Sequence, residues 1–388
     1  MKKVLVYRSQ LLPYSETFIK EQVQALKNWQ AVLVGDVKVK KGLSLNGLDT
    51  ILFSEGKISF IRRLISKLNF LVQRYSSRQR EYLEREKAQL VHVHFATEAV
   101  QIWPLIKAMN LPMLVTLHGF DINIYRKWWE SGQGGHLMKV YPKRLLELAY
   151  EKNVHFIAVS EAIRQRAIEY GIPTEKITVQ YIGVDSERFV PAGLPITQRK
   201  KQILYVGRLV EKKGAGYLIE AFARISDQVP DAELVIVGDG PLRTQFEVQA
   251  DKLKLNVSFL GALSSAKVQQ KLHEARVFCL PSVTAESGDA EGFGIVLLEA
   301  QACGVPVVTS ARGGATEGVK DGITGFSFLE KDTNTLTNRL LRVLQDDELA
   351  LNMSNAAIKY VHENFNIIDC TMNLENFYDE IILNEKYR

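Results

Sequence analysis

Short apolar segments alternate with amphipathic segments along most of the chain. Residues 4–7, 113–117, 202–206 and 234–237 are largely apolar, and between such segments apolar residues recur at steps of three and four. A short apolar run is typical of a buried parallel strand, and the three-and-four spacing is typical of an amphipathic helix. The alternation of the two predicts an α/β fold.

The length of 388 residues suits two domains better than one, because single cores stop growing at roughly 250–300 residues. We predict a first domain over residues 1–190 and a second over 201–365. The segment 191–200 holds two prolines and a glycine among polar residues and is predicted to be a linker. Residues 366–388 form a separate terminal segment.

One amphipathic stretch, residues 57–87, is unusually basic. Between residues 57 and 80 there are seven basic residues and no acidic one, and an apolar stripe follows the helical spacing. The stripe consists of Ile58, Ile61, Ile65, Leu68, Val72 and Tyr75. Such a helix either lies in a membrane interface or docks on its own sheet with a solvated basic face, and both interpretations stay open.

The charges are distributed unevenly between the two halves of the chain. Residues 1–200 carry 30 Lys and Arg against 18 Asp and Glu, a net charge of +12, whereas residues 201–388 carry 19 against 26, a net charge of −7. A basic half predicts an anionic partner, either a membrane surface or an acidic acceptor. Nucleic acid is not expected, because no nucleic-acid-binding motif is found.

Cysteine usage and the N-terminus predict a cytoplasmic protein, at most peripheral to a membrane. The three cysteines have no metal-ligand spacing and are expected to be buried free thiols. The apolar run 4–7 is too short for a signal peptide and is predicted to be the first strand. There is no run of eighteen apolar residues of the kind that spans a membrane.

The strongest candidate for chemistry is the segment from Glu291 to Glu299. Gly292 and Gly294 allow a tight turn, and residues 295–301 are predicted to be a helix whose first N–H groups point back at that turn. An anion would bind there. Carboxylates at the two ends of the segment can each accept hydrogen bonds from vicinal hydroxyls, so the pattern suits a phosphorylated sugar.

Two further strand-to-helix turns carry candidate groups in the second half. Arg208 and Lys213 flank the turn after the strand 202–206, and fixed cations at such a turn can stabilise a diphosphate. Residues 237–241 form a Val-Gly-Asp-Gly-Pro turn, which lacks the third glycine of a dinucleotide-binding motif. No convincing Asp-x-Asp pair for Mg²⁺ is present.

Histidines mark two strand ends in the first half. His118 follows the strand 113–117, where catalytic groups of doubly wound folds gather, and Asp121 lies three residues later. His92 and His94 share one face of a strand, but no third metal ligand is evident. Nearer the N-terminus, Ser15 is the predicted N-cap of a helix that runs to residue 27.

These motifs together resemble the donor site of family 4 retaining glycosyltransferases, which have the GT-B architecture of two doubly wound Rossmann-like domains facing each other across a cleft. The resemblance is carried by the Glu-x7-Glu segment, the Ala-Cys-Gly-Val-Pro-Val-Val run, the Gly-Gly-x-x-Glu turn, Gly207-Arg208 with Lys213-Gly214, and the 237–241 turn. Residues 13–18, Pro-Tyr-Ser-Glu-Thr-Phe, resemble a subgroup of bacterial surface-polysaccharide (colanic acid or exopolysaccharide-type) enzymes.

The resemblance implies a role for most of the candidates. Glu299 would hold the ribose of the donor, Arg208 and Lys213 the diphosphate, and the N–H groups of Phe293, Gly294 and Ile295 the phosphate or sugar. Glu291 and His118 would contact the transferred sugar. The resemblance assigns no role to the other three candidates. From its position beside His118, Asp121 is expected to orient it or bind acceptor, and Ser15 and Glu16 are expected to contact acceptor or only cap a helix. Residues 366–388 would cross back onto the first domain.

No metal and no resident cofactor are implied; the co-substrate is a nucleotide-diphosphate sugar, with UDP or GDP the expected nucleotides. The acceptor would be a saccharide or a lipid-linked saccharide. A GT-B phosphorylase or nucleotide-sugar hydrolase is the nearest alternative, although no lysine motif for a pyridoxal cofactor is seen. A catalytically silent scaffold that the basic helix brings to membranes is the alternative from another class.

Overall fold

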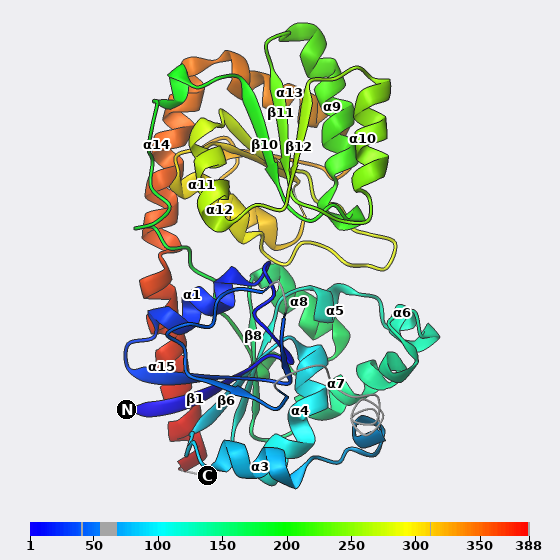
Figure 1. Ribbon diagram of the computed structural model, residues 1–388, viewed down its shortest axis with the longest axis vertical. Coiled ribbons are helices and arrows are strands. Elements are labelled where there is room, and N and C mark those ends of the chain that lie inside the picture. The colour runs from blue at the N-terminus through cyan, green and yellow to red at the C-terminus, as the bar shows by residue number, and fades with distance from the viewer. Residues whose placement is uncertain (40–41, 55–67, 311, 387–388) are drawn as a thin grey trace. The chain divides into compact units, whose positions relative to one another are not determined.

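The chain consists of two compact units in the computed structural model, which describes residues 1–39, 42–54, 68–310 and 312–386. The first unit joins Met1–Gly183 to Ile367–Arg388, and the second is Val184–Asn366 (Figure 1). Each unit has a parallel sheet and its own buried core. The predicted α/β class is therefore confirmed in both units.

The first unit is built on a parallel sheet with the order β5-β3-β1-β6-β7-β8-β9 among the described residues. In chain order the strands are β1 Lys2–Tyr7, β3 Trp29–Gly35, β5 Thr50–Leu52, β6 Leu90–His94, β7 Met113–Leu117, β8 Val154–Ala158 and β9 Ile177–Val179. Two short strands, β2 Gln10–Leu11 and β4 Val37–Lys38, pair separately. The helices of this unit are α1 Thr17–Ala25, α3 Ser77–Glu84, α4 Ala96–Ala108, α5 Phe120–Asn123, α6 Arg126–Ser131, α7 Tyr141–Ala149, α8 Glu161–Tyr170 and α15 Ile367–Lys386, with 3₁₀ turns η1 His136–Val140 and η2 Thr174–Lys176.

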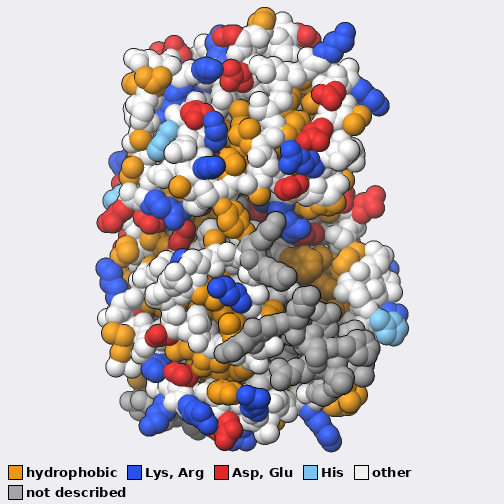
Figure 2. Space-filling view, viewed as in Figure 1, with side chains coloured by type: hydrophobic (Ala, Val, Ile, Leu, Met, Phe, Trp, Pro, Cys, Tyr) orange, Lys and Arg blue, Asp and Glu red, His pale blue; other side chains and the backbone are white. Residues whose placement is uncertain are grey.

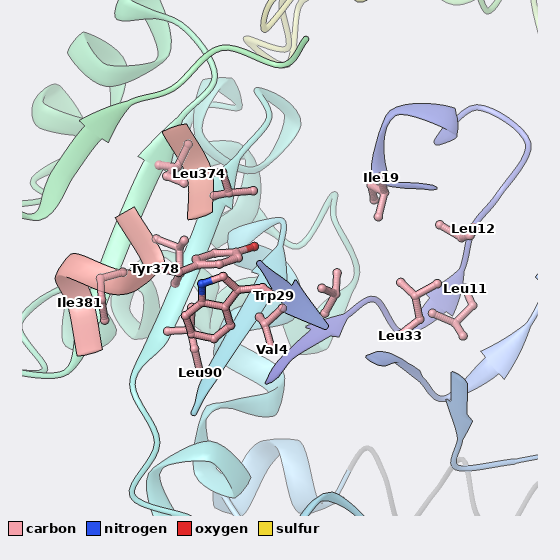
Figure 3. Packing of buried hydrophobic residues seen from close by; sticks show 13 residues of the cluster. Val4, Leu11, Leu12, Ile19, Trp29, Leu33, Leu90, Leu374, Tyr378 and Ile381 are labelled. Carbon is pink, nitrogen blue, oxygen red and sulfur yellow. The ribbon is translucent and has the colours of Figure 1, made fainter. Parts of the chain in front are cut away.

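The C-terminal helix α15 belongs to the core of the first unit. Its residues Leu374, Tyr378 and Ile381 pack with Trp29 and with the side chains of β1 and β6 (Figure 3). The buried carboxylate of Glu375 accepts the backbone N–H groups of residues 27–29 at 2.7–2.9 Å. The last helix is therefore held by both apolar packing and a charge-assisted hydrogen-bond cluster.

The predicted basic helix over 57–87 is wrong in the part that the structure describes. Residues 55–67 lie outside the described residues, residues 68–72 are helical, and a non-helical stretch at 74–76 separates them from α3. Gln73 adopts a left-handed backbone (φ 51°), which ends the first helical stretch. Arg144 donates to the carbonyls of Phe70 and Leu71 at 2.6 and 2.9 Å.

The second unit has a parallel sheet with the order β12-β11-β10-β13-β14-β15 in the described part of the chain. The strands are β10 Gln202–Val206, β11 Glu233–Val237, β12 Val257–Gly261, β13 Val277–Leu280, β14 Val307–Ser310 and β15 Gly325–Phe328. The helices are α9 Ala215–Gln228, α10 Arg243–Lys252, α11 Ser265–Glu274, α12 Ile295–Ala302, α13 Thr333–Gln345 and α14 Asp347–Asn364, with 3₁₀ turns η3 Ile196–Gln198, η4 Glu211–Lys213 and η5 Gly313–Thr316.

The expected linker, residues 191–200, lies inside the second unit instead. Its residues 196–198 form η3, and the guanidinium of Arg199 donates to the carbonyls of Leu272 and Ala275, both at 3.1 Å. Arg276 donates to the carbonyl of Ile196 at 2.6 Å. These contacts fix residues 191–200 to the second unit. The proline and glycine content of the segment alone did not reveal them.

Candidate functional site

Three loops of the second unit meet at the carboxyl ends of β10, β11 and β13, and glycines allow them to touch. Gly214 has a left-handed backbone (φ 68°), and a Cβ atom there would lie 1.8 Å from the carbonyl oxygen of Pro281. A Cβ atom at Gly238 (φ 137°) would lie 1.9 Å from the carbonyl oxygen of Gly207. Only glycine fits these positions. Ligands of doubly wound sheets bind at this edge.

Two neighbouring ion pairs join the loop after β10 to the loop after β13. Lys213 pairs with Glu291, and Lys212 Nζ lies 3.0 Å from Asp289 Oδ1. Both members of the first pair are largely buried, with side chains 16% and 11% exposed. Burial alone raises the pKa of Glu291, but the charges of Lys213 and Lys212 and the hydrogen bonds from Lys213 and Ser282 outweigh it, and the pKa lies below its ordinary value. Glu291 is therefore an anion that can accept hydrogen bonds.

The helix α12 begins at this carboxylate. Gly294 precedes it with a left-handed backbone (φ 80°), and a Cβ atom there would lie 3.5 Å from Glu291 Cγ. The predicted helix 295–301 is confirmed as Ile295–Ala302. The first N–H groups of a helix have no intrahelical acceptor, so those at Ile295 and Val296 face the turn that holds Glu291.

The other two donor candidates on this segment are buried. Phe293 is 5% exposed, and its ring lies 5.6 Å from the ring of Phe365. Glu299 is 9% exposed and lies in the second turn of α12. The structure thus places Glu291, residues 293–295 and Glu299 on one continuous turn and helix.

The two predicted diphosphate ligands on the β10 loop differ in their surroundings. The Arg208 side chain is exposed, and among the described residues it makes no ion pair, whereas Lys213 is paired with Glu291. The backbone of Arg208 is fixed, because its carbonyl accepts the hydroxyl of Tyr205 at 3.1 Å. Among the described residues, Arg208 is therefore a cation without an ion-pair partner, on a loop whose backbone is fixed.

In the first unit, His118 follows β7 and is surrounded by aromatic rings. Its ring lies 5.1 Å from Phe18, 4.5 Å from Phe95 and 5.2 Å from His94. Its Nε2 atom lies 3.0 Å from Nδ1 of His94. Burial, reinforced by the nearby charge of Arg8, lowers the pKa of His118 to about 3. The ring is therefore neutral at physiological pH.

His92 is a satisfied core residue. Its Nδ1 lies 2.6 Å from the Tyr378 hydroxyl, and its Nε2 lies 2.6 Å from the Thr116 hydroxyl. The described residues contain no group of three or more His, Cys, Asp or Glu side chains placed to hold a metal ion. Both ring nitrogens of His92 are therefore engaged within the protein.

Asp121 holds the backbone around His118. Its buried carboxylate accepts the backbone N–H groups of Ala96, His118 and Gly119 at 2.9, 3.1 and 3.0 Å. Burial raises the pKa of this carboxyl group to about 6. Asp121 therefore fixes the backbone that carries His118.

The helix α1 also differs from the prediction. It begins at Thr17, so Glu16 and not Ser15 is the N-cap, and no side chain caps it. Ser15 is exposed, whereas Glu16 is buried and accepts two hydrogen bonds from Arg8 at 2.9 and 2.7 Å. Glu98 pairs with the other side of Arg8. This buried ion cluster was missed, although its signal is a charged residue directly after the strand β1.

A cavity of about 300 Å³ opens in the first unit near the ends of β1 and β3. Its lining includes Tyr7, Asp36, Arg74, Arg78 and Tyr82. Burial raises the pKa of Asp36 to about 6, and its carboxylate lies 3.5 Å from the Tyr7 hydroxyl. Sequence reasoning passed over Asp36, although it follows the buried strand β3 as His118 follows β7.

Two family models match the chain. One, described as glycosyltransferase family 4, matches residues 54–188, and the other, glycosyl transferases group 1, matches residues 187–360. The two matches together cover most of both units.

Curated relatives and solved structures agree with these models. The chain is 30% identical to the amylovoran biosynthesis glycosyltransferase AmsK of Erwinia amylovora over 71% of its own length and 66%, just under two thirds, of that protein. It is also 30% identical to an uncharacterised glycosyltransferase of Methanocaldococcus jannaschii, over 68% and 69% of the two chains. Anabaena HepE, solved in complex with UDP and glucose, has the same fold at 19% identity, with a TM-score of 0.79 over 98% of this chain and 100% of that one. The GT-B fold class is thereby confirmed, and the chain belongs to family 4 of the glycosyltransferases.

Proposed function

We propose that the chain is a retaining, metal-independent glycosyltransferase that moves a sugar from a nucleoside-diphosphate sugar to a saccharide or lipid-linked saccharide, in surface polysaccharide or glycolipid assembly. The observation that carries this proposal is the anionic Glu291 beside Lys213 at the start of α12, with Glu299 on the same helix. The name of the relative AmsK supports the polysaccharide assignment, and the UDP and glucose bound to HepE support a nucleotide-sugar donor.

In this proposal the donor site places cations and N–H groups where negative charge develops during the reaction. As the glycosidic bond breaks, about one additional negative charge grows on the leaving phosphate, and preorganised cations and N–H groups stabilise it. In the proposal Arg208, Lys213 and the first N–H groups of α12 provide this stabilisation without a metal. On binding, the diphosphate of the donor would replace Glu291 as the ionic partner of Lys213. The Glu291 carboxylate would then accept hydrogen bonds from the sugar hydroxyls.

The retaining course needs no nucleophile from the protein in this proposal. Cys279 and Cys303 are buried free thiols, and burial raises both of their pKa values, that of Cys303 to about 12, so neither offers a thiolate. The departing phosphate would take the proton of the acceptor hydroxyl. The neutral His118 would contact the transferred sugar, and no separate general base is required.

Thermal unfolding with UDP, GDP, ADP and TDP tests the donor site. A nucleotide at 100 times its dissociation constant stabilises the folded state by about 2.7 kcal/mol, which raises Tm by a few degrees. We expect UDP or GDP to give this shift in the wild type and in the exposed control Glu348→Ala, and Glu299→Ala to lose it. A shift in all three proteins would remove Glu299 from the ribose site, and no shift in any would contradict the donor-site proposal.

We also propose that the chain works at the cytoplasmic face of a membrane, with the first unit against anionic lipid. Apolar and basic side chains share the visible face of this unit (Figure 2). Leu68, Leu71 and Val72 are 58%, 47% and 51% exposed, and the exposed Arg74 and Arg78 follow them in the chain. Within the described residues no helix is long and apolar enough to span a membrane. Basic residues beside exposed apolar ones suit an anionic lipid surface.

Co-sedimentation with vesicles tests this second proposal. We expect binding to phosphatidylglycerol vesicles and little binding to phosphatidylcholine vesicles. Each basic residue near an anionic surface contributes roughly 1 kcal/mol, so Arg74→Glu with Arg78→Glu should weaken binding by at least about 10-fold. The pair Lys143→Glu with Lys152→Glu makes the same charge change elsewhere in the first unit. Equal losses in both double variants would mean that only net charge matters, and the assigned surface would be wrong.

A further inference from the structure

The buried His94 is the polar neighbour of His118. We propose that His94 is a positioning residue that fixes the tautomer and the ring orientation of His118, and so decides which hydrogen-bonding character His118 offers to the transferred sugar. This inference rests on the proposed function, in which His118 contacts that sugar.

The hydrogen bond between the two rings links their protonation. Nδ1 of His94 lies 3.0 Å from Nε2 of His118, and both imidazoles are neutral because burial lowers their pKa values. A hydrogen bond between two neutral ring nitrogens needs one N–H donor and one bare acceptor. If His94 donates, the proton of His118 lies on Nδ1; if His94 accepts, that proton lies on Nε2. The tautomer of one ring therefore determines the tautomer of the other.

A comparison with His92 shows that His94 is more than a core histidine. Both nitrogens of His92 have partners at 2.6 Å. His94 is only 1% exposed, and its buried Nε2 has no hydrogen-bond partner among the described residues. Buried polar atoms normally have partners, so an unpaired one calls for a reason. Among the described residues, the side-chain hydrogen bond that His94 does make is the one with His118.

The surrounding rings hold His94 in the orientation that this bond requires. Its ring stacks on His92 with centroids 4.5 Å apart and an interplanar angle of 30°, and on His118 at 5.2 Å and 26°. His92 is fixed in turn by Thr116 and by Tyr378 of α15. The register pairs His94 with Thr116, two residues before His118 on the neighbouring strand. His94 is therefore a rigid support from which to orient His118.

Ring nitrogen NMR tests the inference without any need for activity. In the wild type we expect His118 to populate one neutral tautomer. In His94→Leu, which removes the hydrogen-bonding group, His118 should show both tautomers in exchange. In His94→Asn, whose amide lies near the position of Nδ1, a single tautomer should return. A His118 tautomer unchanged in His94→Leu would overturn the proposal.

Kinetics with the donor give the second readout. We expect His94→Leu to lower kcat at least 10-fold with the donor KM within about twofold, and His94→Asn to restore most of the loss. In a His118→Ala background His94→Leu should add little, because the residue acts through His118. Additive losses would assign His94 a general structural role instead. If the wild type turned over no donor, the proposed function would fail while the NMR result would still decide the inference.

Discussion

Replacing Glu291 by alanine is expected to lower kcat by at least about 100-fold while leaving nucleotide affinity within about threefold. That loss is the scale of removing one preorganised group that stabilises a transition state. Glu291 is 11% exposed at its side chain, is anionic, and lies at the start of α12. Its carboxylate would hold the sugar hydroxyls as the ring flattens, whereas the nucleotide would bind further along the same helix.

Two variants separate the charge of Glu291 from its shape. Glu291→Gln keeps the volume but removes the negative charge that pairs with Lys213, so its kcat should fall nearly as far as that of the alanine variant. Asp289→Asn removes the neighbouring acid, which pairs with Lys212 at 3.0 Å, and should lower kcat less than about 10-fold. Steady-state kinetics with the donor identified by thermal unfolding provide the measurement. An unchanged kcat in Glu291→Ala would exclude Glu291 from the mechanism.

The pKa of Glu291 also predicts how the Lys213 pair depends on pH. Its pKa in the folded state lies below its ordinary value. As the pH falls, Glu291 therefore binds a proton at a higher pH in the unfolded chain than in the folded protein. The stability that the ion pair contributes is therefore fully present above the ordinary range of a glutamate. It is lost only as the pH falls through the lower pKa of the folded state.

Features that depend on neighbouring residues were predictable from the sequence. The strand-turn-helix at Glu291 was predicted because glycines, an apolar run and a helical spacing follow one another within a few positions. His118 was recognised because it directly follows a buried strand. The same reasoning failed for Ser15, since a serine before a helix pattern does not show where the first helical turn begins, and the chain uses Glu16.

Features that depend on contacts between distant segments were not predictable in this way. The pairing of Lys213 with Glu291 joins residues 78 positions apart, and it arises because β10 and β13 are neighbours in the sheet. The bond between His94 and His118 likewise needs the pairing of β6 with β7. Residues 191–200 belong to the second unit because two buried arginines hydrogen-bond there. The partners of these two guanidinium groups are not evident from sequence spacing.

Gly214→Ala is expected to destabilise the second unit by about 2–5 kcal/mol. A left-handed backbone costs a residue with a Cβ atom roughly 1–2 kcal/mol, and forcing an extra carbon into a packed position adds about 1–3 kcal/mol. The new Cβ atom would lie 1.8 Å from the carbonyl oxygen of Pro281, which is backbone and cannot rotate away. Urea unfolding of the wild type and the variant measures the difference.

Gly322→Ala separates the collision from the backbone strain. Gly322 has nearly the same φ, 73° against 68°, but a Cβ atom there would have no atom within 4 Å. This control should therefore cost only about 1–2 kcal/mol. Because Gly214 follows Lys212 and Lys213, a displaced loop should also weaken nucleotide binding at least about 10-fold, whereas Gly322→Ala should leave binding unchanged. If the two variants lost equal stability and bound nucleotide equally well, close contact between the β10 and β13 loops would not be what shapes the donor site.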